Sequence, residues 1–128
     1  MLRHLRDTKS HKVFTGVACV APLEVPVHPG YCLRTTVEET TVFFGSEDVI
    51  TNEVLRAYVE SGEGSDAAGG YKIQEGGAIL IDRIVGDYTN VVGLPVHAVR
   101  FLPRSSRSLT EALQTNEKYS TPRGRSRT

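Results

Sequence analysis

Runs of apolar residues and their breaks predict the strands of this chain. Residues 13–20 form a continuous apolar run rich in β-branched side chains, which is typical of a strand covered on both faces. Residues 31–44 are also strand-like, and their central Glu38-Glu39 pair indicates that one edge or face meets water. Prolines and a glycine interrupt the pattern over residues 21–30, so the two strands are predicted to form a hairpin with a long connection.

A short amphipathic helix is predicted after Thr51. This threonine is a good N-cap, and Glu53 in the first turn suits the positive end of the helix dipole. Gly62 ends the helical pattern. Leu2 and Leu5 also have helical spacing, so the start of the chain is interpreted as the last turns of a helix or as disorder. The helix after Thr51 should pack on the sheet through the face formed by Val54, Leu55, Tyr58 and Val59.

The remaining pattern predicts a second hairpin and a last helix. Residues 61–77 are glycine-rich and irregular, and residues 78–85 form an apolar run that predicts a strand. A tight turn at residues 86–87 would lead into a partner strand over residues 88–92. Pro95 suits the first position of a short helix. These elements predict an α/β fold, a mixed β-sheet with flanking helices.

Composition and charge divide the chain into an acidic body and two basic ends. The 128 residues have room for one domain. The net charge is zero, but residues 13–102 carry 12 acidic and five basic residues. Such a body argues against a nucleic-acid groove and permits a metal site built from carboxylates. We therefore predict one domain over residues 1–102 and a basic, mostly disordered tail over residues 103–128.

Cysteine usage and the amino terminus indicate a cytoplasmic protein. Cys19 and Cys32 both lie in apolar runs and are interpreted as buried free thiols, since two cysteines do not make a disulfide framework. Residues 1–12 are basic and polar, without the apolar region of a signal peptide. No stretch approaches the roughly 18 apolar residues that a membrane span requires, so no membrane partner is expected.

Three sequence blocks are more specific than the rest of the chain. Residues 58–74 read Tyr-Val-Glu-Ser-Gly-Glu-Gly-Ser-Asp-Ala-Ala-Gly-Gly-Tyr-Lys-Ile-Gln. Residues 86–95 read Gly-Asp-Tyr-Thr-Asn-Val-Val-Gly-Leu-Pro, and residues 11–17 read His-Lys-Val-Phe-Thr-Gly-Val. These blocks resemble the carboxy-terminal part of the Maf family of nucleoside-triphosphate pyrophosphatases. The resemblance covers roughly residues 1–102.

The resemblance implies a fold and a reaction. The fold would be a partial Maf-like, inosine-triphosphatase-like fold, with a cleft between two lobes. The reaction would be hydrolysis of nucleoside triphosphates, with pyrimidine or modified nucleotides as substrates, to the monophosphate and pyrophosphate. Attack of water on the α-phosphorus needs a divalent cation to offset the phosphate charge, so Mg²⁺ or Mn²⁺ is the implied cofactor.

The resemblance also assigns roles to single residues. Gln74 matches a family glutamine tied to base selectivity, a role that suits an amide because it both donates and accepts hydrogen bonds. Asp66 matches an aspartate near the phosphates and is the candidate metal ligand. Thr15 and Gly16 match the strand that lines the same cleft. The family's general-base aspartate has no counterpart in this chain, so no catalytic residue is assigned.

Four positions depart from the family pattern. Ala67 replaces a lysine, which removes a point charge suited to a phosphate. Gly64 replaces a proline, which loosens the loop entropically. Lys72 and Glu75 stand where glycines are usual. If those glycines need a positive φ, each replacement costs about 1 kcal/mol or more.

Three interpretations of the function remain open. The amino-terminal half of the family carries a Ser-x-Ser-Pro-Arg-Arg-like loop and further catalytic groups, and none of them occurs here. The chain is accordingly interpreted as a truncated enzyme with little turnover. It can instead be a non-catalytic module that binds a nucleotide or dimerises, with itself or with a full-length relative. A poorly folded relic without function is the third alternative.

Overall fold

The protein is described from a computed structural model that covers residues 1–23, 28–100 and 102. It divides into two compact units. The main unit comprises residues 1–16 and 37–99, and the described residues of the second unit are 17–23, 28–36, 100 and 102. The predicted tail over residues 103–128 lies outside the described residues.

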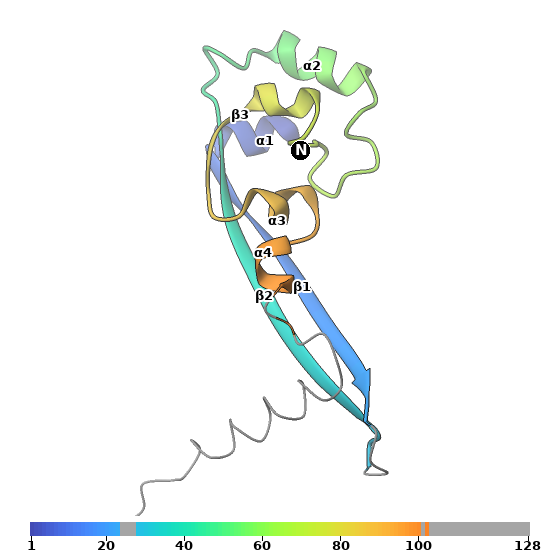
Figure 1. Cartoon of the computed structure of the whole chain (residues 1–128). Helices are drawn as coiled ribbons and strands as arrows, with labels where there is room; N and C mark the ends of the chain where they lie inside the picture. The colour runs from blue at the N-terminus through green and yellow to red at the C-terminus, as the bar shows by residue number, and fades with distance from the viewer. Residues whose placement is uncertain (24–27, 101, 103–128) are drawn as a thin grey trace, which may run out of the picture. The chain divides into compact units, whose positions relative to one another are not determined.

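The described elements are two long strands and one short strand together with short helices (Figure 1). The strand order in the sheet is β1-β2-β3, and β2 and β3 run antiparallel with Thr41 opposite Val85. Helices flank this antiparallel sheet, which confirms the predicted α/β class. The elements in chain order are α1 (Leu2–Asp7), β1 (Ser10–Pro22), β2 (Tyr31–Phe44), α2 (Asn52–Glu60), the 3₁₀-helix η1 (Gly76–Leu80), β3 (Ile81–Val85), α3 (Tyr88–Val92) and α4 (Val96–Val99).

The first strand is covered on one face, so the prediction of a strand covered on both faces was wrong. Burial along β1 alternates between half-buried and exposed positions. Phe14, for example, remains 59% exposed. The strand lies at the edge of the sheet, and one face of it carries no second layer among the described residues. The continuous apolar run therefore reflects β propensity and not two-sided burial.

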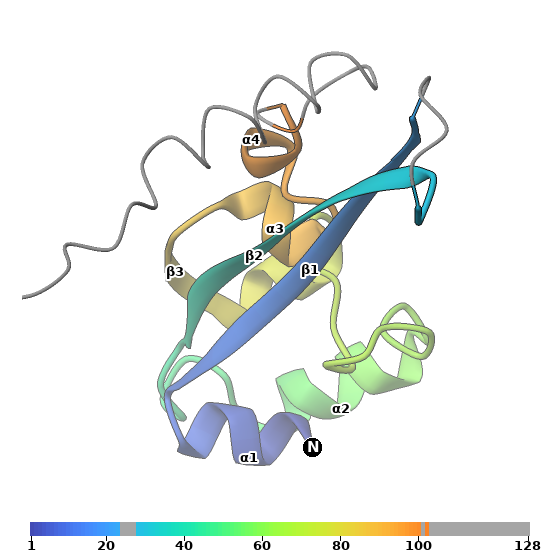
Figure 2. The ribbon, with the colours of Figure 1, turned by 90° about the horizontal axis from the view of Figure 1, so that it is seen from below.

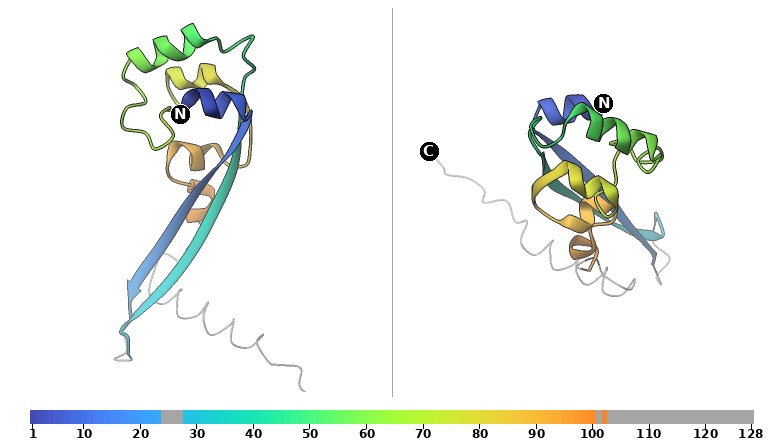
Figure 3. Two further views of the ribbon diagram at one scale, coloured as in Figure 1. Left: turned by 180° about the vertical axis from the view of Figure 1, so that it is seen from behind. Right: turned by 90° about the horizontal axis from the view of Figure 1, so that it is seen from above.

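Helix α2 follows the predicted pattern closely. The Thr51 hydroxyl accepts a hydrogen bond from the Val54 N–H, and Gly62 adopts a positive φ of 73° after the last turn. Leu55 and Tyr58 are buried, whereas Val59 is exposed. The start of the chain is helical rather than irregular, and α1 lies beside α2 (Figures 2 and 3).

An apolar core joins these helices to the sheet within the main unit. Leu2 of α1 and Leu55 of α2 pack with Val42 and Phe44 of β2. The loop after α2 contributes Tyr71 and Ile73, which anchor an otherwise irregular segment. The complete cluster of buried residues is Leu2, Val42, Phe44, Ile50, Leu55, Tyr58, Tyr71, Ile73 and Leu80.

Residues 76–92 differ from the prediction in two places. The expected strand over residues 78–85 begins only at Ile81, because residues 76–80 form a 3₁₀ turn. The expected partner strand over residues 88–92 is the helix α3 (Figure 2). Asp87 explains the difference, since its carboxylate accepts hydrogen bonds from the N–H and the hydroxyl of Thr89 and so caps a helix.

Two further findings concern the cysteines and the membrane. Cys19 and Cys32 are not joined in a disulfide, and the predicted burial is confirmed for Cys32, whereas Cys19 is only half-buried. Within the described part of the chain, no helix has the length and apolar character that crossing a lipid bilayer demands.

Candidate functional site

One pocket of the main unit gathers most of the residues that the sequence singled out. It has a volume of about 540 Å³. Three segments distant in sequence line it: the start of β1, the loop after α2, and the end of α3 with the residue that follows. The lining consists of residues 11–15, residues 66–69, Tyr71, Lys72, Gln74 and residues 90–93.

Three of the four predicted site residues line this pocket. Asp66 and Gln74 come from the loop after α2, and Thr15 comes from β1. Gly16 does not line it, although it is the next residue of the same strand. A Cβ atom added at Gly16 would meet no atom within 4 Å, so the position is open.

Asp66 forms an ion pair with Lys72 at this pocket. The Lys72 Nζ lies 2.9 Å from the Asp66 Oδ1, and the two side chains are 27% and 73% exposed. The hydrogen bond from Lys72 lowers the pKa of Asp66, and the same bond raises the pKa of Lys72. Both groups are therefore charged at neutral pH.

The backbone of Lys72 shows no sign of the strain considered from the sequence. Among the described residues other than glycine, Lys9 has a positive φ, of 65°, and neither Lys72 nor Glu75 does. The cost that would follow from a left-handed conformation at these two positions therefore does not arise.

A second lysine of the pocket is paired differently. The Lys12 Nζ lies 2.6 Å from Glu39 Oε1, on the neighbouring strand β2, and both side chains are largely exposed. Glu39 does not line the pocket. The Lys12 ammonium group is thus held by a carboxylate outside the pocket.

A ring cluster forms the apolar wall of the pocket. His11 Nε2 and the Tyr71 hydroxyl are 2.8 Å apart, and the two rings also meet Phe44 edge to face. Burial lowers the pKa of His11, so its imidazole is neutral at pH 7. Burial also raises the pKa of Tyr71 to about 12. This wall is therefore uncharged.

Glu63 braces the loop that carries Asp66, Lys72 and Gln74. Its carboxylate accepts hydrogen bonds from the Tyr58 hydroxyl at 3.0 Å and from the N–H groups of Gly76 and Gly77 at 3.0 and 2.9 Å. Loss of water alone would raise the pKa of Glu63, but the bonds from the two glycines and the tyrosine outweigh it and lower that pKa. These three bonds give Glu63 a structural role in this part of the chain.

Two glycines of this loop occupy positions without room for a side chain. A Cβ added at Gly64 would collide with the carbonyl oxygen of Gly70, and one added at Gly77 would collide with the carbonyl oxygen of Lys72. Gly64, which replaces the family proline, is therefore required by the close backbone approach in this loop conformation.

Asn90 forms a buried polar wall that the sequence did not single out. Its side chain is 1% exposed, and its Nδ2 donates to Thr40 Oγ1 at 2.9 Å and to the carbonyl oxygens of Val13 and Glu38 at 3.2 and 3.3 Å. The Thr40 hydroxyl donates to the Asp87 carbonyl oxygen. The signal in the sequence that could have indicated a buried polar residue is the position of Asn90 directly before two valines.

The pocket residues fit a divalent cation only in a limited way. Asp66 is the one carboxylate in the described lining, and no group of three or more histidine, cysteine, aspartate or glutamate side chains in the described chain is placed to hold a metal ion. Mg²⁺ commonly keeps several waters and binds through one or two carboxylates together with substrate phosphates. Asp66 suits that mode of binding, in which the protein supplies few ligands.

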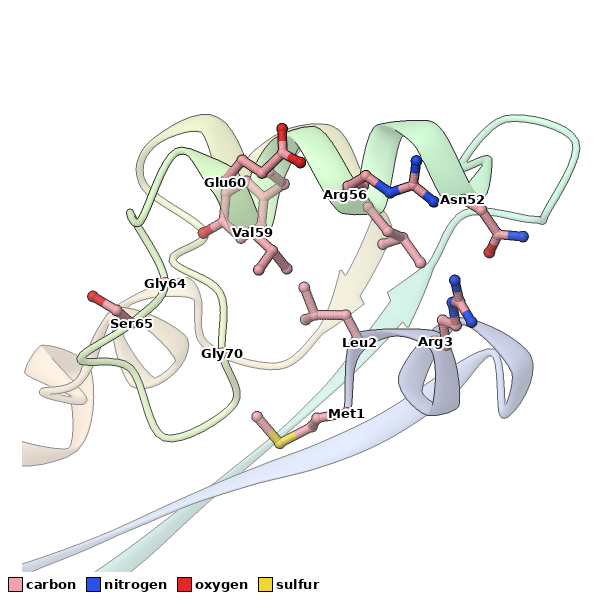
Figure 4. A pocket seen from close by; sticks show the side chains of 12 residues that line it. Met1, Leu2, Arg3, Asn52, Arg56, Val59, Glu60, Gly64, Ser65 and Gly70 are labelled. Atoms are coloured by element: carbon pink, nitrogen blue, oxygen red, sulfur yellow. The ribbon is translucent and has the colours of Figure 1, made fainter.

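A second hollow of the main unit, of about 630 Å³, lies between the start of α1, α2 and the loop after α2. Figure 4 shows Val59 of α2 projecting toward Leu2 of α1, with Arg3, Arg56 and Glu60 at the sides. None of the predicted site residues lines it. It is therefore a weaker candidate for a nucleotide site than the pocket around Asp66.

Comparison with known proteins adds curated relatives. The chain is 58% identical over 99 residues to a dTTP/UTP pyrophosphatase of Schizosaccharomyces pombe, which covers 77% of this chain and 40% of that protein. It is 45% identical over 115 residues to a dTTP/UTP pyrophosphatase of Salinibacter ruber, covering 88% of this chain and 51% of that protein. The chain thus spans about half or less of the length of these relatives.

The family assignment rests on a match that extends beyond the residues of the pocket. The profile of the family described as Maf-like protein matches residues 1–105. That range includes the pocket-lining segments from β1, from the loop after α2 and from α3. This chain therefore belongs to the Maf-like protein family.

Proposed function

We propose that the pocket around Asp66 binds a nucleoside triphosphate and that the chain is a form of a nucleoside-triphosphate pyrophosphatase. One observation carries this proposal: Asp66, Gln74 and Thr15 converge on a single pocket from two segments distant in sequence. A volume of about 540 Å³ lies within the range of about 300–1,000 Å³ usual for small-molecule sites. The names of the relatives, dTTP/UTP pyrophosphatase, support a pyrimidine nucleotide as the ligand.

Each pocket residue has a role in this proposal. Gln74 is exposed at the pocket, and its amide can donate to and accept from the edge of a pyrimidine base. Asp66 would hold Mg²⁺ or Mn²⁺, and the cation would supply positive charge to the phosphates when bound. Thr15 offers a hydroxyl on the strand that forms the opposite wall. The reaction would be attack of water on the α-phosphorus, with pyrophosphate as the leaving group.

We further propose that the isolated chain turns over slowly. Orienting or deprotonating the attacking water takes a positioned base, and Asp66 is the one carboxylate in the described lining. That carboxylate is already paired with Lys72. His11, though neutral, is bound to Tyr71. The pocket therefore offers groups for binding a nucleotide and few for activating water.

The alternative is a non-catalytic module that binds a nucleotide or dimerises, with itself or with a full-length relative. The described lining favours this alternative, because its one carboxylate, Asp66, is paired with Lys72 and no second carboxylate is present there to activate water. A cytoplasmic location is part of both versions of the proposal.

Calorimetry and a pyrophosphate-release assay together test the proposal. The purified 128-residue chain would be titrated with dTTP, UTP, ATP and GTP in the presence of Mg²⁺ or Mn²⁺. Tighter binding of the pyrimidine nucleotides with slow pyrophosphate release is expected. Gln74→Ala should reduce the preference for pyrimidines, whereas Glu75→Ala, the exposed neighbour outside the pocket lining, should leave it unchanged.

The possible results separate the alternatives. Rapid metal-dependent release of pyrophosphate would refute the slow-turnover part of the proposal. Binding without any release would favour the non-catalytic module, and light scattering would then show whether the chain dimerises. Absence of binding for all four nucleotides would refute nucleotide recognition at this pocket.

A further inference from the structure

The described lining of the pocket contains two lysines and one carboxylate, although the body of the chain over residues 13–102 is acidic. Lys12 and Lys72 are the lysine or arginine residues in its described lining, and Asp66 is the carboxylate there. The neighbouring His11 is neutral, because burial lowers its pKa. Two lysines at one pocket of a body with seven more acidic than basic residues over residues 13–102 favour an anionic ligand at this place.

The two lysines differ in where their ammonium groups are held. The partner of Lys12 is Glu39, which lies outside the pocket, and the Lys12 side chain is 57% exposed. The partner of Lys72 is Asp66, which itself lines the pocket, and the Lys72 side chain is 27% exposed. The Lys72 ammonium group is therefore kept at the pocket, whereas that of Lys12 is drawn away from it.

The backbone at Lys72 is held by a hydrogen bond, by close packing and by two buried neighbours. Its N–H donates to the Tyr58 hydroxyl at 3.0 Å, and its carbonyl oxygen closely approaches Gly77. Its neighbours Tyr71 and Ile73 are both members of the buried core. A fixed backbone spares the cost of ordering a loop when a ligand binds, and the Asp66 ion pair already restricts the Lys72 side chain.

We propose that Lys72 binds the phosphate chain of the nucleotide, with Asp66 holding its ammonium group at the pocket. An ammonium group has three N–H donors, so it can keep Asp66 and still donate to phosphate oxygens. The assignment rests on the nucleotide binding proposed above. It gives this chain a cation at the pocket although Ala67, on the same loop, carries no charge.

The test compares two lysine variants with three ligands. The full chain would be titrated by calorimetry with dTTP, with inorganic tripolyphosphate and with thymidine, in a chelating buffer so that Asp66 has no metal to bind. Lys72→Met should weaken dTTP and tripolyphosphate binding about tenfold or more, the loss expected for a charged hydrogen bond. Thymidine binding should not change. Lys12→Met, the matched control, should alter each affinity less than about twofold.

A double variant separates direct phosphate binding from mere neutralisation of Asp66. If Lys72 only cancels the charge of Asp66, then Asp66→Asn in the Lys72→Met background should restore tripolyphosphate binding. If Lys72 contacts phosphate, the double variant should stay about as weak as Lys72→Met, and Lys72→Arg should retain binding. Thermal melting of each variant would show that the fold is kept.

The outcomes distinguish this assignment from the proposed function. An unchanged affinity of Lys72→Met for tripolyphosphate, or its recovery in the double variant, would overturn the role of Lys72 and leave nucleotide binding standing. Tripolyphosphate binding that depends on Lys72, without any preference of the chain for nucleotides, would support Lys72 and overturn the proposed function. A wild-type chain that binds none of the phosphates, either in the chelating buffer or with Mg²⁺ added, would overturn both.

Discussion

Two buried clusters hold the main unit together by different means. Around Leu80, side chains from α1, α2, β2 and the loop after α2 pack mainly by apolar contact. Around Asn90, an asparagine and Thr40 tie α3 to both long strands by hydrogen bonds. The apolar cluster positions the loop wall of the pocket, whereas the polar cluster positions the wall formed by α3. The pocket thus depends on packing on one side and on directional bonds on the other.

The difference between the clusters has a physical cause. The backbone hydrogen bonds of the loop after α2, such as that from the Gly70 N–H to the Ala67 carbonyl oxygen, join residues within the loop, so Tyr71 and Ile73 anchor it to the core by burial. Helix α3 is only five residues long and cannot bury a wide apolar face. Asn90 instead supplies hydrogen bonds, which fix the position of a short helix more uniquely than apolar contact does.

Removing apolar volume from the cluster around Leu80 should cause the largest loss of stability. Leu80 is fully buried, and Leu80→Ala should lower the free energy of unfolding by about 2–5 kcal/mol through lost contacts and a cavity. Urea unfolding followed by circular dichroism measures the change. Ile79→Ala, at the adjacent position that is 66% exposed, should cost less than about 0.5 kcal/mol. Equal costs at both positions would contradict the placement of the core.

Breaking the polar cluster around Asn90 should cause the second-largest loss of stability. Asn90→Leu should cost about 1–3 kcal/mol, because it leaves buried carbonyl oxygens of β1 and β2 without their donor. Asn90→Asp keeps the shape but places a carboxylate beside those oxygens, so its cost should rise with pH as the aspartate ionises. Thermal melting at pH 5 and pH 8 checks both variants. A pH-independent Asn90→Asp would contradict the donor role of the amide.

A single hydroxyl in the loop brace should have a smaller effect. Tyr58→Phe removes the group that donates to Glu63 and accepts from the Lys72 N–H, and it should cost about 1–2 kcal/mol. Tyr88→Phe is the matched control, because Tyr88 is 46% exposed. Differential scanning calorimetry would compare the two variants. The brace would be unimportant if the two melting temperatures fell equally.

Protonation of His11 should give the smallest effect. Its pKa in the folded chain lies below the ordinary value of 6.5, so below that pH the unfolded chain binds more protons than the folded one. Stability is therefore fully present above pH 6.5 and falls as the pH decreases from 6.5. Urea unfolding at pH 7.5 and pH 5.5 measures the loss, and His11→Gln should flatten it. A loss that persists in His11→Gln would point to other groups.

The sequence predicted the elements whose signals are local. Thr51 and Gly62 mark the ends of α2 through capping chemistry that neighbouring residues supply. The same reasoning failed at Tyr88–Val92, where β-branched residues favoured a strand and the Asp87 cap decided for a helix. Two-sided burial of β1 was also predicted wrongly, because an apolar, β-branched run does not show whether a second layer covers each face of the strand.

The pocket residues could be predicted from the sequence only where a local motif contains them. Motif blocks pointed to Asp66, Gln74 and Thr15, which line the pocket, and to Gly16, which does not. His11 and Tyr71 lie 60 residues apart, and no periodicity relates them. The Lys72–Asp66 pair could be found only once the loop conformation was known, since Lys72 first looked like a strained substitution for glycine.

The brace around Glu63 has a consequence for exchange of backbone protons with solvent. The N–H groups of Gly76, Gly77 and Lys72 lie in or beside irregular backbone, yet each donates to a side chain of the brace. Their deuterium uptake should therefore require the brace to open, which couples them to α2 through Tyr58. In kinetic terms this loop belongs to the same cooperative unit as the helix before it, and it should open together with that helix rather than fluctuate as a surface loop.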